Sequence, residues 1–201
     1  MPPASETRSM ASDLRDDAMT RFPVPSFEDL PADLRERIDE ESERAGFTPN
    51  VFAAMAYAPE QFRAFFAFHD ALVDSDLDRA EVEMIVVAVS GVNHCYYCNV
   101  AHGALCRIYA KDPTLADQLV ANYRTADVSE SRRAMLDVAV KLTERPTEVD
   151  ERDFERLREA GYSEREIWDI GAVTAFYNLS NRLALFADMR PNDEFHTLGR
   201  E

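Results

Sequence analysis

The spacing of apolar residues constrains the fold of this chain more than any other feature. Between positions 59 and 73 a helical stripe repeats every three or four residues: Phe62, Phe65, Phe66, His69, Leu72 and Val73. No comparable run alternates apolar and polar residues as a half-buried strand does. The chain also has only 6 glycines and no hairpin dipeptide. The sequence therefore predicts an all-α fold.

Capping residues and helix stops divide the chain into successive helices. Asp78 and Ser129 are expected to cap helix N-termini, and Gly91 with Asn93 is expected to end the helix before the cysteine-rich segment. The last helix has a potential bend at Gly171. The predicted helices cover residues 31–46, 48–58, 59–73, 79–91, 95–110, 114–122, 129–144 and 163–189, with a further short helix within 146–163 that ends at Gly161.

The mass of 22.8 kDa fits one domain with short additions at its ends. Residues 1–30 are polar and interrupted by prolines, and we expect a flexible N-terminal arm there. Residues 31–190 are expected to form the helical domain. Residues 191–201 are expected to form a polar C-terminal tail.

The net charge of -16 predicts repulsion from nucleic acid and from anionic membranes. The longest nearly apolar run, at 84–92, is about half of the ~20 residues that a membrane-spanning helix needs. The N-terminus has no apolar segment typical of a secretory signal. An odd number of cysteines also disfavours a secreted disulfide framework. We therefore expect a cytoplasmic protein with reduced thiols.

All 3 cysteines and two histidines lie in one stretch, "NHCYYCNVAHGALC", at 93–106. A zinc site is disfavoured because Cys98 and Cys106 would lie ~12 Å apart along a helix. Two thiolates on one zinc are at most ~4.6 Å apart. A c-type haem site needs histidine directly after the second cysteine, where this chain has Asn99. We therefore expect neither metal nor cofactor.

A dithiol fits the stretch better. Cys95 and Cys98 would be neighbours on the first turn of a helix, at a spacing that a disulfide tolerates. His102 follows one turn later as a proton acceptor or donor. The helix N-terminus favours Cys95 as the more acidic thiol, whereas proximity to His102 favours Cys98. We predict Cys98, because a positioned base also transfers the proton.

Glu83 lies on the preceding helix, next to its apolar run. If the two helices pack antiparallel, Glu83 faces the thiol pair. A buried carboxylate without a partner is costly, and a histidine or a water linked to the thiol would relieve that cost. Glu83, His102 and the two thiols would then form a base, a relay and a dithiol.

These residues resemble the signature of the carboxymuconolactone decarboxylase superfamily: Glu83, eleven residues, Cys95-Tyr-Tyr-Cys98, three residues, then His102. Its alkylhydroperoxidase D branch and the related peroxidase-related proteins carry the CxxC. The resemblance is specific over 80–110 and weaker over 45–190. "FYNLSNR" at 176–182 is similar to a helix of the peroxidase-related proteins. The chain departs at Tyr97, where the alkylhydroperoxidase D enzymes often have histidine.

The resemblance implies an AhpD-like helical bundle that forms a homo-oligomer, commonly a trimer or a hexamer. It implies that Cys98 attacks peroxide, that Cys95 resolves the sulfenic acid as a disulfide, and that Glu83 and His102 assist proton transfer. The predicted function is thus a thiol-dependent peroxidase that needs a hydroperoxide substrate and an external dithiol reductant.

Two other functions stay open. In a carboxymuconolactone-type lyase, Glu83 and His102 would do acid–base work without the thiols. In a non-catalytic oligomer, the dithiol would be a redox sensor.

Several further polar residues are interpreted as structural: a buried Cys106, a core His69, and Asn178, Asn181 and Arg182 on one helical face. His196 lies in the polar tail, and we assign it no functional role.

Overall fold

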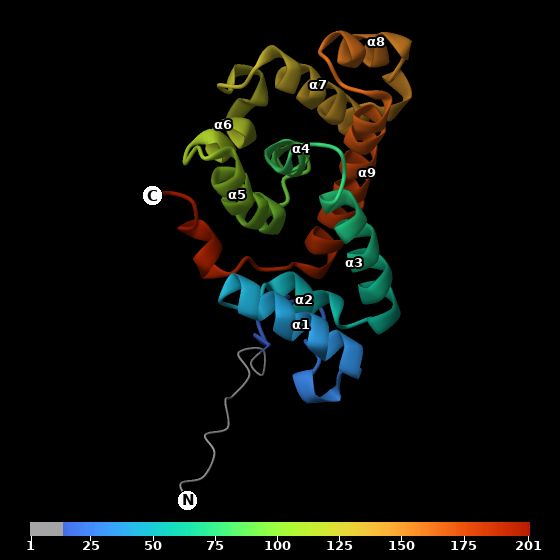
Figure 1. The fold of residues 1–201 in the computed structure, drawn as a ribbon. Coiled ribbons are helices and arrows are strands. Elements are labelled where there is room, and N and C mark those ends of the chain that lie inside the picture. Colours follow the sequence, from blue (N-terminus) through green and yellow to red (C-terminus); the bar gives the residue numbers. More distant parts are fainter. Residues whose placement is uncertain (1–13) are drawn as a thin grey trace, which may run out of the picture. The chain divides into compact units, whose positions relative to one another are not determined.

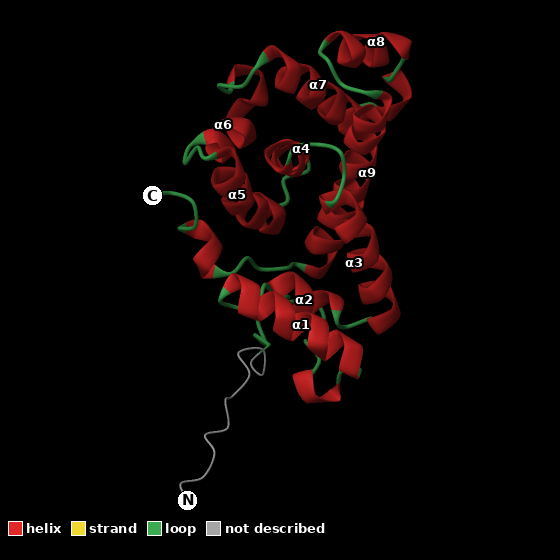
Figure 2. Cartoon of the chain, in the orientation of Figure 1, coloured by secondary structure: helices red, strands yellow, loops and turns green. Residues whose placement is uncertain are grey.

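The computed structural model describes residues 14–201, and every regular element in that range is a helix (Figure 1; Figure 2). One isolated bridge pairs Met19 with Met189. The all-α prediction is confirmed for this part of the chain. None of the helices described is long and apolar enough to cross a membrane.

The chain divides into two compact units. The first contains the described residues up to Phe66 together with Ala187–Arg190, and the second contains Ala67–Phe186 with Pro191–Glu201. The helix α3, Pro59–Val73, begins in the first unit and ends in the second. The domain boundaries predicted at residues 30 and 190 stay predictions.

The first unit contains the 3-10 turn Phe27–Asp29, α1 (Ala32–Ala45), α2 (Asn50–Met55) and the start of α3. An aromatic cluster forms its centre, where Phe52 stacks on Phe66 at 4.4 Å between ring centroids. Part of the predicted arm lies outside the described residues. The rest packs within this unit: Ala18 is buried, and its carbonyl accepts the Arg190 N–H at 2.9 Å.

The second unit is built around α4. Its α-helices after α3 are α4 (Arg79–Val92), α5 (Tyr96–Ala110), α6 (Leu115–Asn122), α7 (Glu130–Glu144), α8 (Glu151–Glu159) and α9 (Glu164–Ala187). Short 3-10 turns cover Tyr123–Thr125, Pro146–Glu148 and Asp193–His196. Figure 1 shows α5, α6 and α7 arranged around α4, and α4 contacts all three.

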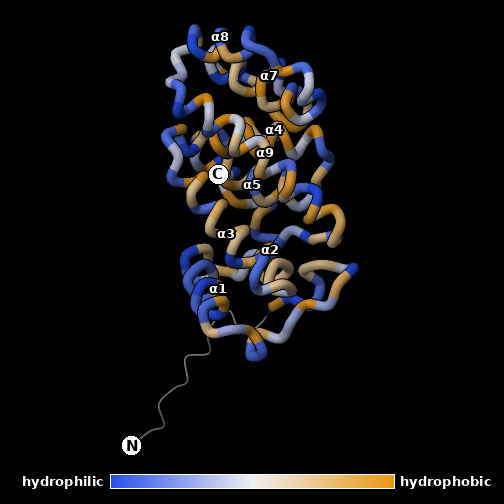
Figure 3. Tube along the Cα trace, turned by 90° about the vertical axis from the view of Figure 1, so that its right-hand side faces the viewer, coloured by the Kyte–Doolittle hydropathy of each residue, from blue (hydrophilic) through white to orange (hydrophobic). Residues whose placement is uncertain are grey.

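Apolar sequence explains why α4 is central. The run from Met84 to Val89 is buried on every side of the helix. Figure 3 shows the contrast between the hydrophobic α4 and the mostly hydrophilic α1. A helix that is apolar all round must be enclosed by other elements, as α4 is here.

The predicted caps are confirmed. The Asp78 carboxylate accepts the Ala80 N–H at 2.8 Å, and the Ser129 hydroxyl accepts the Arg132 N–H at 3.3 Å. The predicted helix end at Gly91 and Asn93 is confirmed, because α4 ends at Val92 and Asn93 is its C-cap. The left-handed residue that turns the chain is His94, with φ of 55°.

Gly171, where a bend was predicted, does not interrupt the last helix. The helix α9 runs without interruption from Glu164 to Ala187, through Gly171. A single glycine weakens a helix without breaking it when its neighbours pack well. Val173 and Thr174, which follow this glycine, are fully buried.

Candidate active site

A tight turn places the start of α5 beside the end of α4. Asn93 ends α4, His94 adopts the left-handed conformation, and the Cys95 N–H donates to the Ser90 carbonyl at 3.0 Å. Because so few residues separate the two helices, they run antiparallel. Glu83, near the start of α4, therefore comes to lie opposite His102 in the middle of α5.

The Glu83 carboxylate is buried, with 1% of its side chain exposed, and it has two partners. Its Oε2 lies 2.8 Å from His102 Nδ1, and its Oε1 lies 2.9 Å from Arg79 Nη2. Sequence reasoning anticipated a histidine partner and missed the arginine. These contacts offset the cost of burying the charge.

The His102 ring is held from two sides. Its Nδ1 faces Glu83, and the edge of its ring meets Tyr177 at 4.8 Å between centroids and 80° between planes. An ionised carboxylate can only accept a hydrogen bond, so Nδ1 carries the proton. The Nε2 lone pair then remains as the basic position of the ring.

Both thiols of the pair are free, and each residue is 1% exposed. Cys95 is the N-cap of α5, and Cys98 is its third helical residue. A hydrogen bond from the Cys98 thiol lowers the pKa of Cys95, and the Cys98 and Tyr97 N–H groups act in the same direction against burial. The pKa of Cys98 is raised well above its usual value by the same hydrogen bond, by burial and by the charge on Cys95.

The two thiols therefore influence one another, and Cys95 has the lower pKa of the pair. The prediction that Cys98 is the more acidic thiol is wrong. The Cys98 and Tyr97 N–H groups at the helix start favour the thiolate form of the N-cap residue Cys95, which lowers its pKa.

A network of asparagines fixes the turn before Cys95. Asn93 donates to Asn178 Oδ1 at 3.0 Å and to Asn181 Oδ1 at 2.9 Å. Asn181 is fully buried and donates to Ser90 Oγ at 3.0 Å, while Arg182 donates to Asn178. These bonds join α9 to the end of α4, which agrees with the interpretation of Asn178, Asn181 and Arg182 as structural residues. The Asn181 amide also lowers the pKa of both thiols.

Tyr177 of α9 lies near the pair and was not predicted as a site residue, whereas His69 of α3 was predicted to be a core residue. Tyr177 is buried, and burial followed by the charges of Glu83 and Cys98 holds its pKa well above the usual value. The sequence feature that could have identified Tyr177 is its position within "FYNLSNR", the segment similar to a helix of the peroxidase-related proteins. His69 contacts the Phe176 ring, and its pKa is lowered chiefly by burial. It belongs to the surroundings of the site.

Cys106 is fully buried, and burial followed by the charge of Glu83 raises its pKa to about 12. It therefore stays a neutral thiol at physiological pH. This agrees with the interpretation of Cys106 as a small apolar residue. No group of three potential metal-binding side chains is present in residues 14–201.

Several known proteins are similar to this chain in both sequence and fold. The family model for the carboxymuconolactone decarboxylase family matches residues 59–141. The AhpD-core, peroxidase-related protein of Ralstonia eutropha JMP134 is 54% identical, with a TM-score of 0.89 over 91% of this chain and 97% of that chain. A peroxidase-related protein of Silicibacter sp. TM1040 is 40% identical, with a TM-score of 0.86 over 92% of this chain and 97% of that one.

The chain belongs to the AhpD-like, peroxidase-related branch of the carboxymuconolactone decarboxylase superfamily. The debrominase Bmp8 has a TM-score of 0.71 over 83% of this chain and 90% of its own at 20% identity, which shows a shared fold alone. A comparison with curated protein sequences returned no match.

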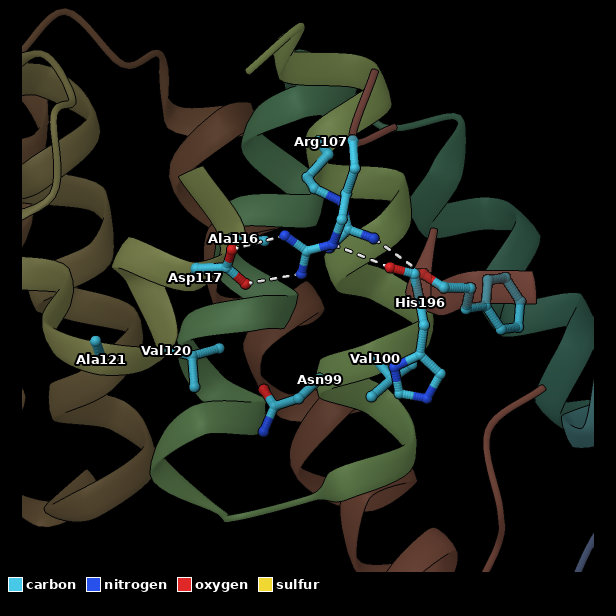
Figure 4. A pocket seen from close by; sticks show the side chains of 10 residues that line it. Asn99, Val100, Arg107, Ala116, Asp117, Val120, Ala121 and His196 are labelled. Atoms are coloured by element: carbon cyan, nitrogen blue, oxygen red, sulfur yellow. Dashed lines mark hydrogen bonds and ion pairs between the residues drawn. The ribbon is translucent and has the colours of Figure 1, made fainter. Parts of the chain in front are cut away.

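A cavity of about 290 Å³ lies elsewhere in this AhpD-like protein, between α5, α6 and the C-terminal tail (Figure 4). Arg107 donates to the Leu198 carbonyl at 3.0 Å, and Arg200 pairs with Asp117 at 2.9 Å. These two contacts hold the C-terminal tail against α5 and α6. His196 lines the cavity and approaches Tyr96 at 3.4 Å. None of the predicted site residues lines it.

Proposed function

We propose that this protein is a thiol-dependent peroxidase that reduces hydroperoxides through a dithiol–disulfide cycle of Cys95 and Cys98. The observation that carries the proposal is the buried Glu83–His102 contact on the same helix pair as the two free thiols Cys95 and Cys98. A base and a dithiol with one thiol of lowered pKa are the two parts that peroxide reduction needs. Peroxidase-related relatives of high identity support the same assignment.

In the first step the Cys98 sulfur attacks the terminal oxygen of the hydroperoxide as its proton passes to His102 Nε2. The oxygen–oxygen bond breaks, and the leaving alkoxide takes that proton to become an alcohol. Cys98 is oxidised to the sulfenic acid. Glu83 stabilises the transient imidazolium, because its Oε2 already lies 2.8 Å from Nδ1.

In the second step the Cys95 thiolate attacks the Cys98 sulfur and releases hydroxide, which takes a proton from solvent. The product is a Cys95–Cys98 disulfide. An external dithiol then reduces it by thiol–disulfide exchange and is itself oxidised. No metal or organic cofactor takes part in these steps.

Thiol titration tests the proposal. One equivalent of a hydroperoxide is expected to lower the free thiols of the denatured chain from three to one, and a dithiol is expected to restore them. Because burial keeps Cys106 neutral, a Cys106→Ala variant is expected to lose the same two thiols. Full retention of the thiols by the wild-type chain would contradict the proposal.

The lyase alternative is favoured by one observation, namely that the Glu83–His102 pair is complete without either sulfur. A variant with serine at both Cys95 and Cys98 separates the two functions. The peroxidase loses all turnover in that variant, whereas a lyase that relies on acid–base chemistry keeps its activity.

We also propose that the chain is a homo-oligomer, a trimer or a hexamer, assembled through an exposed stripe of α9. Trp168, Leu179 and Phe186 lie on one side of this helix with exposures of 71%, 51% and 66%. Apolar residues that are exposed in a continuous row are typical of interfaces. A Leu179→Glu variant is expected to give smaller species by light scattering, because it places a charge in the stripe.

Phe154→Glu on α8 is the matched control, because Phe154 is exposed but lies outside the stripe. Equal sizes of the wild-type and Leu179→Glu species would exclude α9 as the interface. Measuring each sample under oxidant and under reductant separates a peroxidase from a redox-controlled assembly. Only the latter changes size with the state of the dithiol.

A further inference from the structure

Arg79 is the second partner of Glu83, and its environment is unusual. Its Nη2 lies 2.9 Å from Glu83 Oε1, one helical turn away on α4. Within residues 14–201 its buried Nε and Nη1 atoms have no hydrogen-bond partner. Its guanidinium lies instead over the Tyr109 ring of α5, at 5.1 Å from the centroid. A cation covered by an aromatic face is held in place without competing acceptors.

The two Glu83 oxygens therefore have separate roles. Oε1 is taken by Arg79, so only Oε2 is available to His102. This division fixes the plane of the carboxylate and directs one lone pair at Nδ1. It also makes the Arg79–Glu83 pair electrically neutral, so the burial of Glu83 does not require a second cation.

Without Arg79, the buried carboxylate would need another positive charge, and His102 is the nearest group that can supply it. A protonated His102 cannot accept the proton of Cys98. The arginine thus opposes the charged form of the ring while preserving its hydrogen bond to Glu83.

The other charged or titratable groups near Glu83 and His102 do not take over this role. His69 of α3 is itself disfavoured as a cation by burial, and Tyr177 of α9 and Cys106 of α5 stay neutral. Arg132 of α7 pairs with Glu81, with 3.2 Å between Nε and Oε1.

We propose that Arg79 is a positioning residue that keeps His102 neutral, with the proton on Nδ1 and Nε2 free to accept the Cys98 proton. The assignment of Nε2 as the acceptor rests on the proposed function. The protonation state of His102 does not, and it is measured without peroxide.

The test is a pH titration of the four histidine rings by nitrogen-15 NMR on the full chain, with His102 assigned from a His102→Gln spectrum. In the wild type at pH 7 we expect a neutral ring protonated on Nδ1. In Arg79→Met we expect the imidazolium at pH 7, with the titration midpoint of the ring at least about one pH unit higher, the usual effect of an opposing charge within 4–6 Å. Arg79→Lys is expected to restore the neutral ring.

Arg132→Met is the matched control, because it removes an arginine–glutamate pair of α4 that does not involve Glu83. It should leave the His102 midpoint unchanged. If Arg79→Met does not fold, Arg79→Gln carries the test, since its amide can still hold Oε1 but has no charge. The same upward shift is expected.

An unchanged or lowered midpoint in the folded Arg79 variant would overturn the inference. So would an equal shift in Arg132→Met. A shifted midpoint in a chain whose thiols do not react with hydroperoxide would keep the positioning role and reject the peroxidase.

Discussion

Replacing Cys98 with serine is expected to abolish hydroperoxide consumption, and replacing Cys95 is expected to stop the cycle after one step. In Cys98→Ser the attacking sulfur is gone, so no sulfenic acid forms at position 98. In Cys95→Ser the sulfenic acid forms on Cys98 but has no resolving thiol, and it accumulates. Trapping with dimedone, followed by mass spectrometry, locates the oxidised sulfur in each variant.

Both variants also test which thiol attacks. Because the pKa of Cys98 is raised well above its usual value, Cys98 depends on a proton acceptor to become reactive. A sulfenic acid on Cys95 in the Cys98→Ser variant would assign the attack to Cys95 instead. Cys106→Ser is the control, because that thiol is buried apart from the pair and is expected to leave the rate unchanged.

Removing the base is expected to have the second large effect. His102→Gln, and separately Glu83→Gln, should lower the rate of the first oxidation step by about 10² to 10⁴-fold, the usual contribution of general acid–base catalysis. His102→Gln has no group that can take the Cys98 proton. Glu83→Gln keeps the shape of the side chain but no longer stabilises the imidazolium. Stopped-flow measurement of the first thiol oxidation checks both.

Glu81→Gln is the control for these variants. Glu81 lies on the same helix and pairs with Arg132 and Tyr162, away from His102. Its substitution is expected to leave the rate of the first step close to that of the wild type, because neither Glu81 nor its two partners contact His102. A comparable loss in Glu81→Gln would show that disturbing α4 in general, and not removing the base, lowers the rate.

The sequence predicted the helices well because their signals are local. Apolar spacing and capping side chains act over one or two turns, and Asp78 and Ser129 cap the expected helices. Gly171 looks like a weak point of the last helix by propensity, but it lies inside α9, and Val173 and Thr174 after it are fully buried. Tertiary packing there outweighs a cost of about 1 kcal/mol per glycine.

The site was predictable where spacing along one helix determines it. Cys98 and His102 are one turn apart on α5 whatever the rest of the chain does. Arg79 was missed although it lies one turn before Glu83, because a surface arginine in that position is common and its burial depends on Tyr109 of another helix. The predicted order of the two thiol pKa values was wrong because it depends on which residue is the N-cap of the helix. Helix ends are the boundaries that a sequence predicts least well.

Cys95 serves as the N-cap of α5 as well as one half of the dithiol. A bridged sulfur cannot ionise, so closing the disulfide would remove the favourable interaction between a Cys95 thiolate and the first turn of the helix, worth up to about 1 kcal/mol. Oxidation and helix fraying would then be linked. The disulfide form would have a less ordered first turn of α5 at the point where an external reductant must reach the buried sulfurs. Reduction to the dithiol would restore that order.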